Sequence, residues 1–200
     1  MIKENILLVS ISSKGALFLA EHSLSRAELL RIFPLLSRIG DARLTEQIIA
    51  VWQNAFADCL WPRLEDACFN PEAHPFRLVD HINAATQGAL AVAQAMEKYQ
   101  GIVLDHDRII ALGYLHDVSK ILEFEPGPDG TPRKSEIGRL IQHGAMGAFY
   151  ARKHGMALEY IHLILTHTPQ SKMAPVYKEA WLFSHIDLAD AQIVDSFHEA

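Results

Sequence analysis

The chain has 200 residues, of which half are apolar and 21% are charged, and its formal net charge at pH 7 is -6. Length and composition predict one soluble globular domain with a substantial core, and the negative charge argues against non-specific nucleic-acid binding, which needs a basic face. No apolar run reaches the roughly 18 residues of a membrane span, and no signal-peptide pattern is present, so we expect a cytoplasmic protein without membrane contact. The two cysteines, Cys59 and Cys68, form no CxxC pair, so we expect them to be reduced and expect no disulfide framework.

Residues 1–75 are expected to form a helical extension that packs on the rest of the chain and carries no chemistry. The segment from Ser25 to Glu28 has the capping-box pattern that opens a helix. A second helix is predicted by apolar residues at every fourth position, namely Leu44, Ile48, Trp52 and Phe56. Pro62 and Pro71 then mark a connection.

Residues 76–200 are predicted to be a second unit made of helices. The first helix covers about 76–99 and ends at Gly101, and the next is capped by either Asp105 or Asp107 and ends in His116-Asp117. The Pro- and Gly-rich stretch 125–135 is expected to be a surface loop. Further helices are predicted over about 135–153, 157–168 and from 176 onward. No strand pattern follows residue 20, so we expect an all-α fold.

Histidine is unusually frequent, with eleven residues. Six histidine and aspartate side chains have apolar neighbours in the predicted helices: His81, His116, Asp117, His143, His167 and Asp187. Burying such groups is costly unless they are satisfied, and a helical bundle can aim them at one point in its core. Imidazoles and carboxylates without thiolates suit Mn, Fe, Co, Ni or Zn, and Asp117 has two oxygens that could bridge two ions about 3.5–4 Å apart.

The stretch IIALGYLHDVSK, from Ile109 to Lys120, resembles the signature of the HD superfamily of metal-dependent phosphohydrolases. The resemblance covers roughly residues 75–196 and implies an HD-domain helical bundle behind the N-terminal extension. It also implies a four-residue metal-binding core made of His81, His116, Asp117 and Asp187. His143 and His167 match the two added histidines of the six-ligand, dinuclear subgroup, so the resemblance implies one or two divalent transition metal ions.

Several neighbouring residues compete for these roles. Asp187 and Asp190 are three positions apart on one predicted helix, and Asp187 is preferred because HIDLADA resembles the final motif of the family, in which the first Asp binds. His162 precedes His167 by five residues, a spacing that does not place both on one helix face. We therefore interpret His162 as a core or surface histidine. Two alternatives stay open: His162 supports a metal ligand without binding the ion, or it is the ligand in place of His167. His185 is expected on the helix surface.

A second His-Asp pair, His106-Asp107, begins a helix among polar residues and is interpreted as an exposed cap. Lys120 follows His116-Asp117 by one helical turn. We expect it to hold phosphate oxygens and stabilise negative charge in the transition state, with Asp117 as the other catalytic residue. Further candidates for binding phosphate lie in two loops: Arg133, Lys134 and Lys172.

These residues favour hydrolysis of a phosphate ester by attack of a metal-bound hydroxide, and the resemblance implies a nucleotide or a phosphorylated metabolite as substrate. Two other functions would use the same residues, an HD-type di-iron oxygenase and a non-catalytic metal- or ligand-binding sensor. The lack of a tyrosine before Tyr99 argues against the phosphonate-cleaving oxygenases, and the lack of a GYP motif argues against the best-known cyclic-dinucleotide phosphodiesterases. The expected partner is a small phosphorylated molecule; a homo-oligomer stays open.

Overall fold

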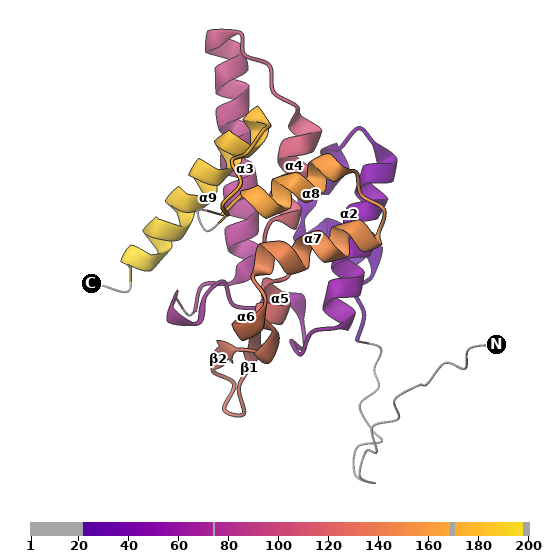
Figure 1. Cartoon of the computed structure of the whole chain (residues 1–200), viewed down its shortest axis with the longest axis vertical. Coiled ribbons are helices and arrows are strands. Elements are labelled where there is room, and N and C mark those ends of the chain that lie inside the picture. Colours follow the sequence, from indigo (N-terminus) through magenta and orange to yellow (C-terminus); the bar gives the residue numbers. More distant parts are fainter. Residues whose placement is uncertain (1–21, 74, 169–170, 198–200) are drawn as a thin grey trace, which may run out of the picture.

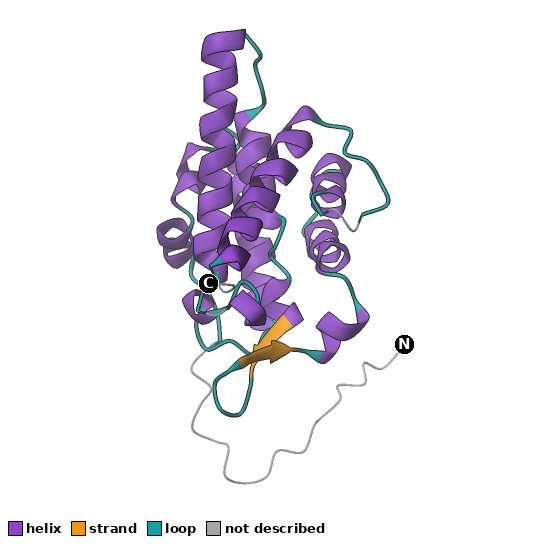
Figure 2. Cartoon of the chain, turned by 90° about the vertical axis from the view of Figure 1, so that its left-hand side faces the viewer, coloured by secondary structure: helices purple, strands orange, loops and turns teal. Residues whose placement is uncertain are grey.

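The computed structural model describes residues 22–73, 75–168 and 171–197. Within these ranges the chain is built of helices and one small hairpin, so the all-α prediction is confirmed at the level of fold class (Figure 1, Figure 2). The first 21 residues of the expected extension lie outside the described part. The helices are α1 (Arg26–Ile32), α2 (Ala42–Ala57), α3 (Leu78–Gln100), α4 (His106–Leu115), α5 (Lys120–Glu123), α6 (Glu136–Leu140), α7 (His143–Lys153), α8 (Leu158–Thr166) and α9 (Lys178–Ser196). Short 3₁₀ turns cover Pro34–Arg38, Leu64–Asp66 and Pro71–Ala73, and the strands are β1 (Phe124–Pro126) and β2 (Pro132–Lys134).

The two N-terminal helices begin where the sequence predicts. Ser25 and Glu28 form the predicted capping box: the Ser25 Oγ accepts from the Glu28 N–H at 3.2 Å, and the Glu28 carboxylate accepts from the Ser25 N–H at 2.8 Å. Asp41 caps α2 by accepting a hydrogen bond of 2.8 Å from the Arg43 N–H. The four apolar residues spaced along α2 are all buried, as an amphipathic helix requires: Leu44, Ile48, Trp52 and Phe56.

The connection from α3 to α4 resolves one open choice. Gly101 has a φ of 69° and ends α3 in the left-handed conformation that suits glycine. Asp105 is the residue that caps α4, and it accepts a backbone hydrogen bond of 3.0 Å from the first turn. Asp107 instead accepts from the Gly40 N–H at 2.9 Å. The interpretation of His106-Asp107 as an exposed cap is wrong, because both residues are half-buried and Asp107 anchors the segment that precedes α2.

The stretch 125–135 lies largely at the surface, as expected, but the expectation of a loop without strands is wrong. Strands β1 and β2 pair antiparallel, with Phe124 opposite Lys134, and Gly130, with a φ of 84°, lies in the tight turn between them. Each strand has only three residues and contains a proline, Pro126 or Pro132. Because alternation over three residues is too short to recognise, the hairpin leaves no readable strand pattern in the sequence.

The single helix expected from residue 135 to 153 is two helices in the structure. Ser135 caps α6 as predicted, but the backbone at Ile141 is extended, with φ of -130° and ψ of 128°, and α7 starts afresh at His143. The Ser119 Oγ donates a hydrogen bond of 2.6 Å to the carbonyl of His143 and so ties this start to the segment after α4. Packing contacts therefore override a locally continuous helical pattern.

Helix α4 lies inside the bundle, against α2, α3, α8 and α9. Every residue from Ile109 to Leu115 is buried, so the chain emerges from α4 in the interior of the molecule. The predicted His116-Asp117 pair follows at once. The packing of α4 is thus what places polar side chains at a point that helices from several parts of the chain can reach.

One hydrophobic core includes residues from both predicted units, from Leu24 to Phe183. The Trp52 indole N–H donates to the carbonyl of Tyr114 at 2.7 Å, and the Trp61 indole N–H donates to that of Phe124 at 2.8 Å. The division near residue 75 stays a prediction about how the sequence is organised. In the described ranges, no helix has both the length and the apolar character required to cross a membrane.

Candidate metal centre

His116 and Asp117 are almost completely buried, with exposed fractions of 0% and 2%. His116 closes α4, and its Nδ1–H donates to the carbonyl of Gly113 at 2.8 Å. This hydrogen bond fixes the ring orientation and directs Nε2 into the interior. A buried imidazole nitrogen held in this way is ready to accept a cation.

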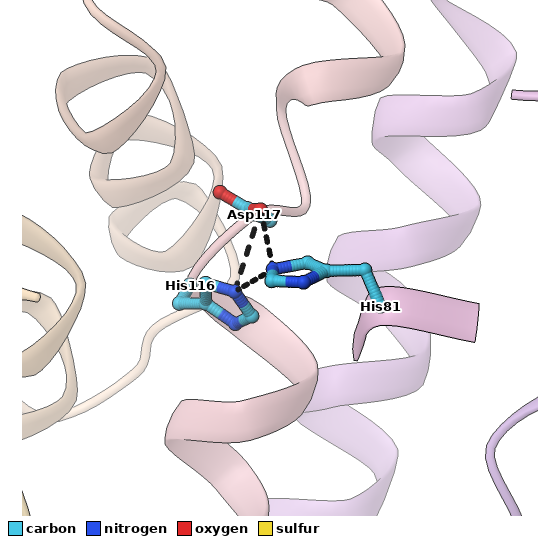
Figure 3. Close-up of side chains that lie close together, drawn as sticks. All are labelled: His81, His116 and Asp117. Atoms are coloured by element: carbon cyan, nitrogen blue, oxygen red, sulfur yellow. Dashed lines mark hydrogen bonds and ion pairs between the residues drawn. The ribbon is translucent and has the colours of Figure 1, made fainter. Parts of the chain in front are cut away.

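The first cluster gathers around that nitrogen. His81, from α3, places its Nε2 at 3.4 Å from the Nε2 of His116 and at 3.4 Å from Oδ2 of Asp117 (Figure 3). Asp187, from α9, brings its Oδ1 to 3.0 Å from His81 Nε2 and 3.4 Å from His116 Nε2. Four of the predicted ligand side chains thus direct donor atoms at one point.

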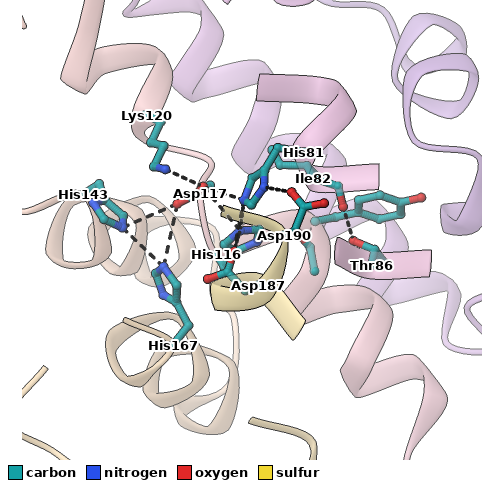
Figure 4. A network of polar contacts seen from close by, with 12 residues as sticks. His81, Ile82, Thr86, His116, Asp117, Lys120, His143, His167, Asp187 and Asp190 are labelled. Atoms are coloured by element: carbon teal, nitrogen blue, oxygen red, sulfur yellow. Dashed lines mark hydrogen bonds and ion pairs between the residues drawn. The ribbon is translucent and has the colours of Figure 1, made fainter. Parts of the chain in front are cut away.

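The second cluster lies on the other side of Asp117. His143 and His167 approach through their Nε2 atoms at 3.3 Å, and these atoms lie 3.5 and 3.7 Å from Oδ1 of Asp117 (Figure 4). The His167 Nδ1–H donates to the carbonyl of Ile164 at 2.6 Å, which again leaves Nε2 free to bind. His143 contacts the Glu123 carboxylate at 3.2 Å through Nδ1.

The structure therefore brings all six predicted residues together, with one oxygen of Asp117 facing each cluster. Either cluster has three donor atoms close enough to hold a metal ion, and the donors are the imidazoles and carboxylates that divalent transition metals bind. These residues fit such ions, while their individual roles as ligands stay a prediction. The open choice between Asp187 and Asp190 has a geometric answer, since only Asp187 approaches the Nε2 edge of His81.

Electrostatics in the first cluster follow from this geometry. Burial would lower the pKa of His81, but three neighbouring carboxylates raise it to about 10. Burial would also lower the pKa of His116, which Asp117 and Asp187 raise to about 9. Burial alone would raise the pKa of Asp117, yet Lys120 and His116 hold it well below its usual range. Without an ion, protons on the imidazoles balance the carboxylates, and a divalent cation would take their place.

We did not predict from the sequence that Asp190 and Glu123 would each contact an imidazole of the site. Asp190 lies 2.6 Å from Nδ1 of His81, whereas the sequence suggested it only as a rival ligand. Glu123, at the end of α5, was not singled out at all. Its pKa would rise on burial, but the contact with His143 lowers it. Only the position of Asp190 could have been predicted, because it lies three residues after Asp187 and residues three apart on a helix share a face.

Lys120 lies at the site as predicted. Its ammonium nitrogen is 3.0 Å from Oδ2 of Asp117 and 4.0 Å from the centre of the Phe69 ring. Phe69 also packs on the His81 imidazole, with ring centres 4.1 Å apart. The segment expected to be pure scaffold therefore contributes a wall of the site.

The three loop cations differ in position. Lys134 and Lys120 line a polar cavity of about 420 Å³ that reaches His143. Lys172 lines another cavity, of about 410 Å³, that reaches His167. Arg133 lies outside both cavities and pairs with Glu125 at 2.7 Å. The geometry thus brings Lys134 and Lys172 toward the clusters but not Arg133.

His162 and His185 lie as interpreted. The Nε2 of His162 accepts a hydrogen bond of 3.1 Å from the Val176 N–H. This hydrogen bond holds the segment before α9 in place. His185 is exposed, and its Nδ1–H donates to the carbonyl of Trp181 at 2.7 Å. Neither imidazole takes part in the two clusters.

Comparison with known proteins is consistent with this geometry. A family model described as HD domain matches residues 78–192. The dihydroneopterin 2',3'-cyclic phosphate phosphodiesterase of Methanocaldococcus jannaschii is 26% identical over 176 residues, which cover 82% of this chain and 70% of that protein. No solved structure matches the chain significantly. The matches support the predicted phosphohydrolase and favour neither the oxygenase nor the sensor.

Proposed function

The chain belongs to the HD-domain family and is a metal-dependent phosphohydrolase, and from this premise we propose that it hydrolyses a small phosphodiester at two divalent ions. The observation that carries the proposal is the placement of Asp117. Its two oxygens face different pairs of imidazoles, at 3.4 Å on one side and at 3.5 and 3.7 Å on the other. Such an arrangement suits a carboxylate that bridges two ions.

The two ion sites differ in how open they are. His81, His116, Asp117 and Asp187 would hold the first ion, and Asp117, His143 and His167 would hold the second. Three protein ligands leave coordination positions for water and substrate, as in catalytic sites. A polar cavity of about 420 Å³, lined by Lys120 and Lys134, reaches His143 of the second site. Substrate is therefore expected to enter on the side of the second site.

Bound divalent ions would lower the pKa of a coordinated water and neutralise phosphoryl oxygens. The side chains of this chain supply the rest. Lys120 lies beside Asp117 and lines the cavity that reaches His143, so its ammonium can hold a phosphoryl oxygen whose negative charge grows in the transition state. Lys134, across the same cavity, can hold a second phosphate oxygen. Lys172 is a further candidate from the other cavity.

For the substrate, we extend the activity of the archaeal relative and propose a 2',3'-cyclic phosphate of a nucleoside-like or pterin-like compound. The cavity of about 420 Å³ beside His143 has room for the organic part. Asn70 and Asp195 line it and offer hydrogen-bonding groups for a polar ring.

The test is hydrolysis of 2',3'-cyclic AMP and of bis(p-nitrophenyl) phosphate by protein loaded separately with Mn, Co, Ni, Fe, Zn or Mg. We expect hydrolysis with at least one transition metal and two ions per chain. Asp117→Asn, which keeps the size of the side chain but weakens the bridge, should lower kcat by about a thousandfold or more and reduce metal content.

His106→Ala is the matched control for His116→Ala, because both histidines precede an aspartate but His106 lies at the far end of α4. The control should retain metal and activity, whereas His116→Ala should lose both. Full turnover and full metal content in Asp117→Asn would refute the proposal. Oxygen consumption by the iron-loaded protein without phosphate release would instead support the oxygenase.

A further inference from the structure

Two carboxylates stand behind imidazoles at the site, on the edges that face away from the clusters. Asp190 Oδ2 lies within hydrogen-bond distance of Nδ1 of His81, at 2.6 Å (Figure 4). Glu123 Oε2 lies 3.2 Å from Nδ1 of His143, an ion-pair contact without the alignment of a hydrogen bond. In both rings the opposite nitrogen, Nε2, faces the cluster. One such carboxylate therefore accompanies each cluster.

We propose that Asp190 and Glu123 are positioning residues, one for each ion site, which orient an imidazole and strengthen its hold on the ion. The inference rests on the two-ion site proposed above. A carboxylate beside the Nδ1–H favours the tautomer with a free Nε2 lone pair, restrains the ring and makes the ligand more basic. The other two imidazoles, His116 and His167, use carbonyls of their own helices for this purpose.

Asp190 acts together with Asp187 from one face of α9. The Asp187 carboxylate approaches the Nε2 edge of His81 at 3.0 Å, and Asp190 approaches the Nδ1 edge at 2.6 Å. Residues three apart on a helix lie on one side of it, so α9 contacts both edges of the His81 ring. With its Oδ2 on the far edge of His81, Asp190 supports the imidazole rather than the ion itself.

Glu123 connects the second site to the hairpin. Its other oxygen, Oε1, lies 3.4 Å from the Lys134 ammonium, which lines the cavity where substrate is proposed to bind. The side chain is only 13% exposed, so solvent competes little for the contact with His143. The orientation of one ligand and the position of one phosphate-binding lysine thus depend on the same carboxylate.

The experiment is a stepwise cobalt(II) titration followed by visible absorption, on wild type, Asp190→Ala, Asp190→Asn, Glu123→Ala and Glu123→Gln. Because the first site has more ligands, Asp190→Ala should weaken the tighter binding step about 10- to 100-fold and Glu123→Ala the weaker step by a similar factor. Asp190→Asn, whose amide oxygen can still accept the Nδ1–H, should lose less than Asp190→Ala. Glu125→Gln, which removes a carboxylate two residues from Glu123 and touches no imidazole of either cluster in the described structure, is the matched control and should leave both steps unchanged.

Site-selective loss is the decisive outcome, because a structural defect would weaken both steps together and lower the thermal midpoint of the metal-free protein. Equal weakening of both steps in each variant would overturn the inference, as would unchanged affinity in both alanine variants. If either of these results were found while the wild type bound two ions and hydrolysed cyclic phosphate, the proposed function would still hold and only the positioning roles of Asp190 and Glu123 would be refuted. If the wild type bound no ion and hydrolysed nothing, both proposals would be wrong.

Discussion

Asp117 is a buried carboxylate that stays ionised because cations surround it. Burial would raise its pKa, but the ammonium of Lys120 and the imidazole of His116 hold that pKa well below the usual range. The carboxylates in turn raise the pKa of His81 to about 10 and that of His116 to about 9, against the lowering effect of burial. In the metal-free protein these residues form a network of coupled charges, in which the loss of one proton changes every neighbour.

This network predicts how the stability of the metal-free protein depends on pH. The pKa values of His81 and His116 lie above the unfolded value of 6.5, so the folded state binds more protons and their stabilising effect is complete below about pH 6.5. That effect should be lost as the pH rises toward 9 and 10. Urea unfolding of the metal-free protein should therefore show a free energy of unfolding that falls between pH 6.5 and 8.5.

His81→Gln should flatten this fall, because it removes one of the two protons concerned. Metal binding should show the opposite trend, with affinity rising over the same interval, since the ion competes with those protons. Titration calorimetry in buffers of different ionisation enthalpy would count the protons released. A metal-free protein whose stability is constant or rises from pH 6.5 to 8.5 would contradict the argument.

At the scale of elements, the close contact of α3 with α4 sets the distance between His81 and His116. Gly113 lies against Thr86, so that a Cβ at position 113 would overlap the threonine side chain. Thr86 is buried, and its hydroxyl donates to the carbonyl of Ile82 at 2.6 Å. A larger residue at 113 would therefore force the two helices apart beside the first cluster.

Gly113→Ala tests this contact. Alanine in a helix interior is favoured over glycine by about 1 kcal/mol, but overpacking a buried helix contact costs about 1–3 kcal/mol. We expect a net destabilisation of up to about 2 kcal/mol, together with weaker binding at the first ion site. Urea unfolding and the cobalt titration would measure the two effects.

The double variant Gly113→Ala with Thr86→Ala is the control, because it removes most of the side chain that a new Cβ would meet. It should regain part of the affinity lost in the single variant, and a double-mutant cycle would give the coupling. Strictly additive losses would show that contact with Thr86 is not the cause.

At the scale of the whole molecule, the two predicted units share one core. Indole hydrogen bonds join Trp52 to the carbonyl of Tyr114 and Trp61 to that of Phe124, and Phe69 packs on the His81 ring. The elements before residue 75 therefore support α4 and one wall of the site. We expect these elements to be needed for a stable metal site.

This arrangement predicts one cooperative unfolding transition. In Trp181→Phe the remaining indoles, Trp52 and Trp61, report on the N-terminal elements, while far-ultraviolet circular dichroism reports on all helices. The two urea transitions should coincide, and bound metal should shift them together. A fluorescence transition at clearly lower urea than the circular dichroism transition would show that the N-terminal elements unfold on their own.

Helix periodicity, caps and ligand types could be predicted from the sequence. The capping box at Ser25, the apolar spacing of α2 and the stop at Gly101 are each encoded within a few neighbouring residues. The His116-Asp117 pair at the end of an apolar helix indicated the family. Burying such a pair requires partners, and few side chains can supply them.

Other features depend on residues far apart in the chain. Asp190 meets His81 across 109 positions, and its role behind the ring, rather than on the ion side, follows from the packing of α9 on α3. Glu123, Phe69, the hairpin and the break at Ile141 likewise depend on contacts that no local pattern records. The sequence alone thus determined which helices form and which chemical groups they carry, because periodicity and capping are local. Only the tertiary structure decided which edge of each imidazole faces which carboxylate, because that depends on how the helices pack.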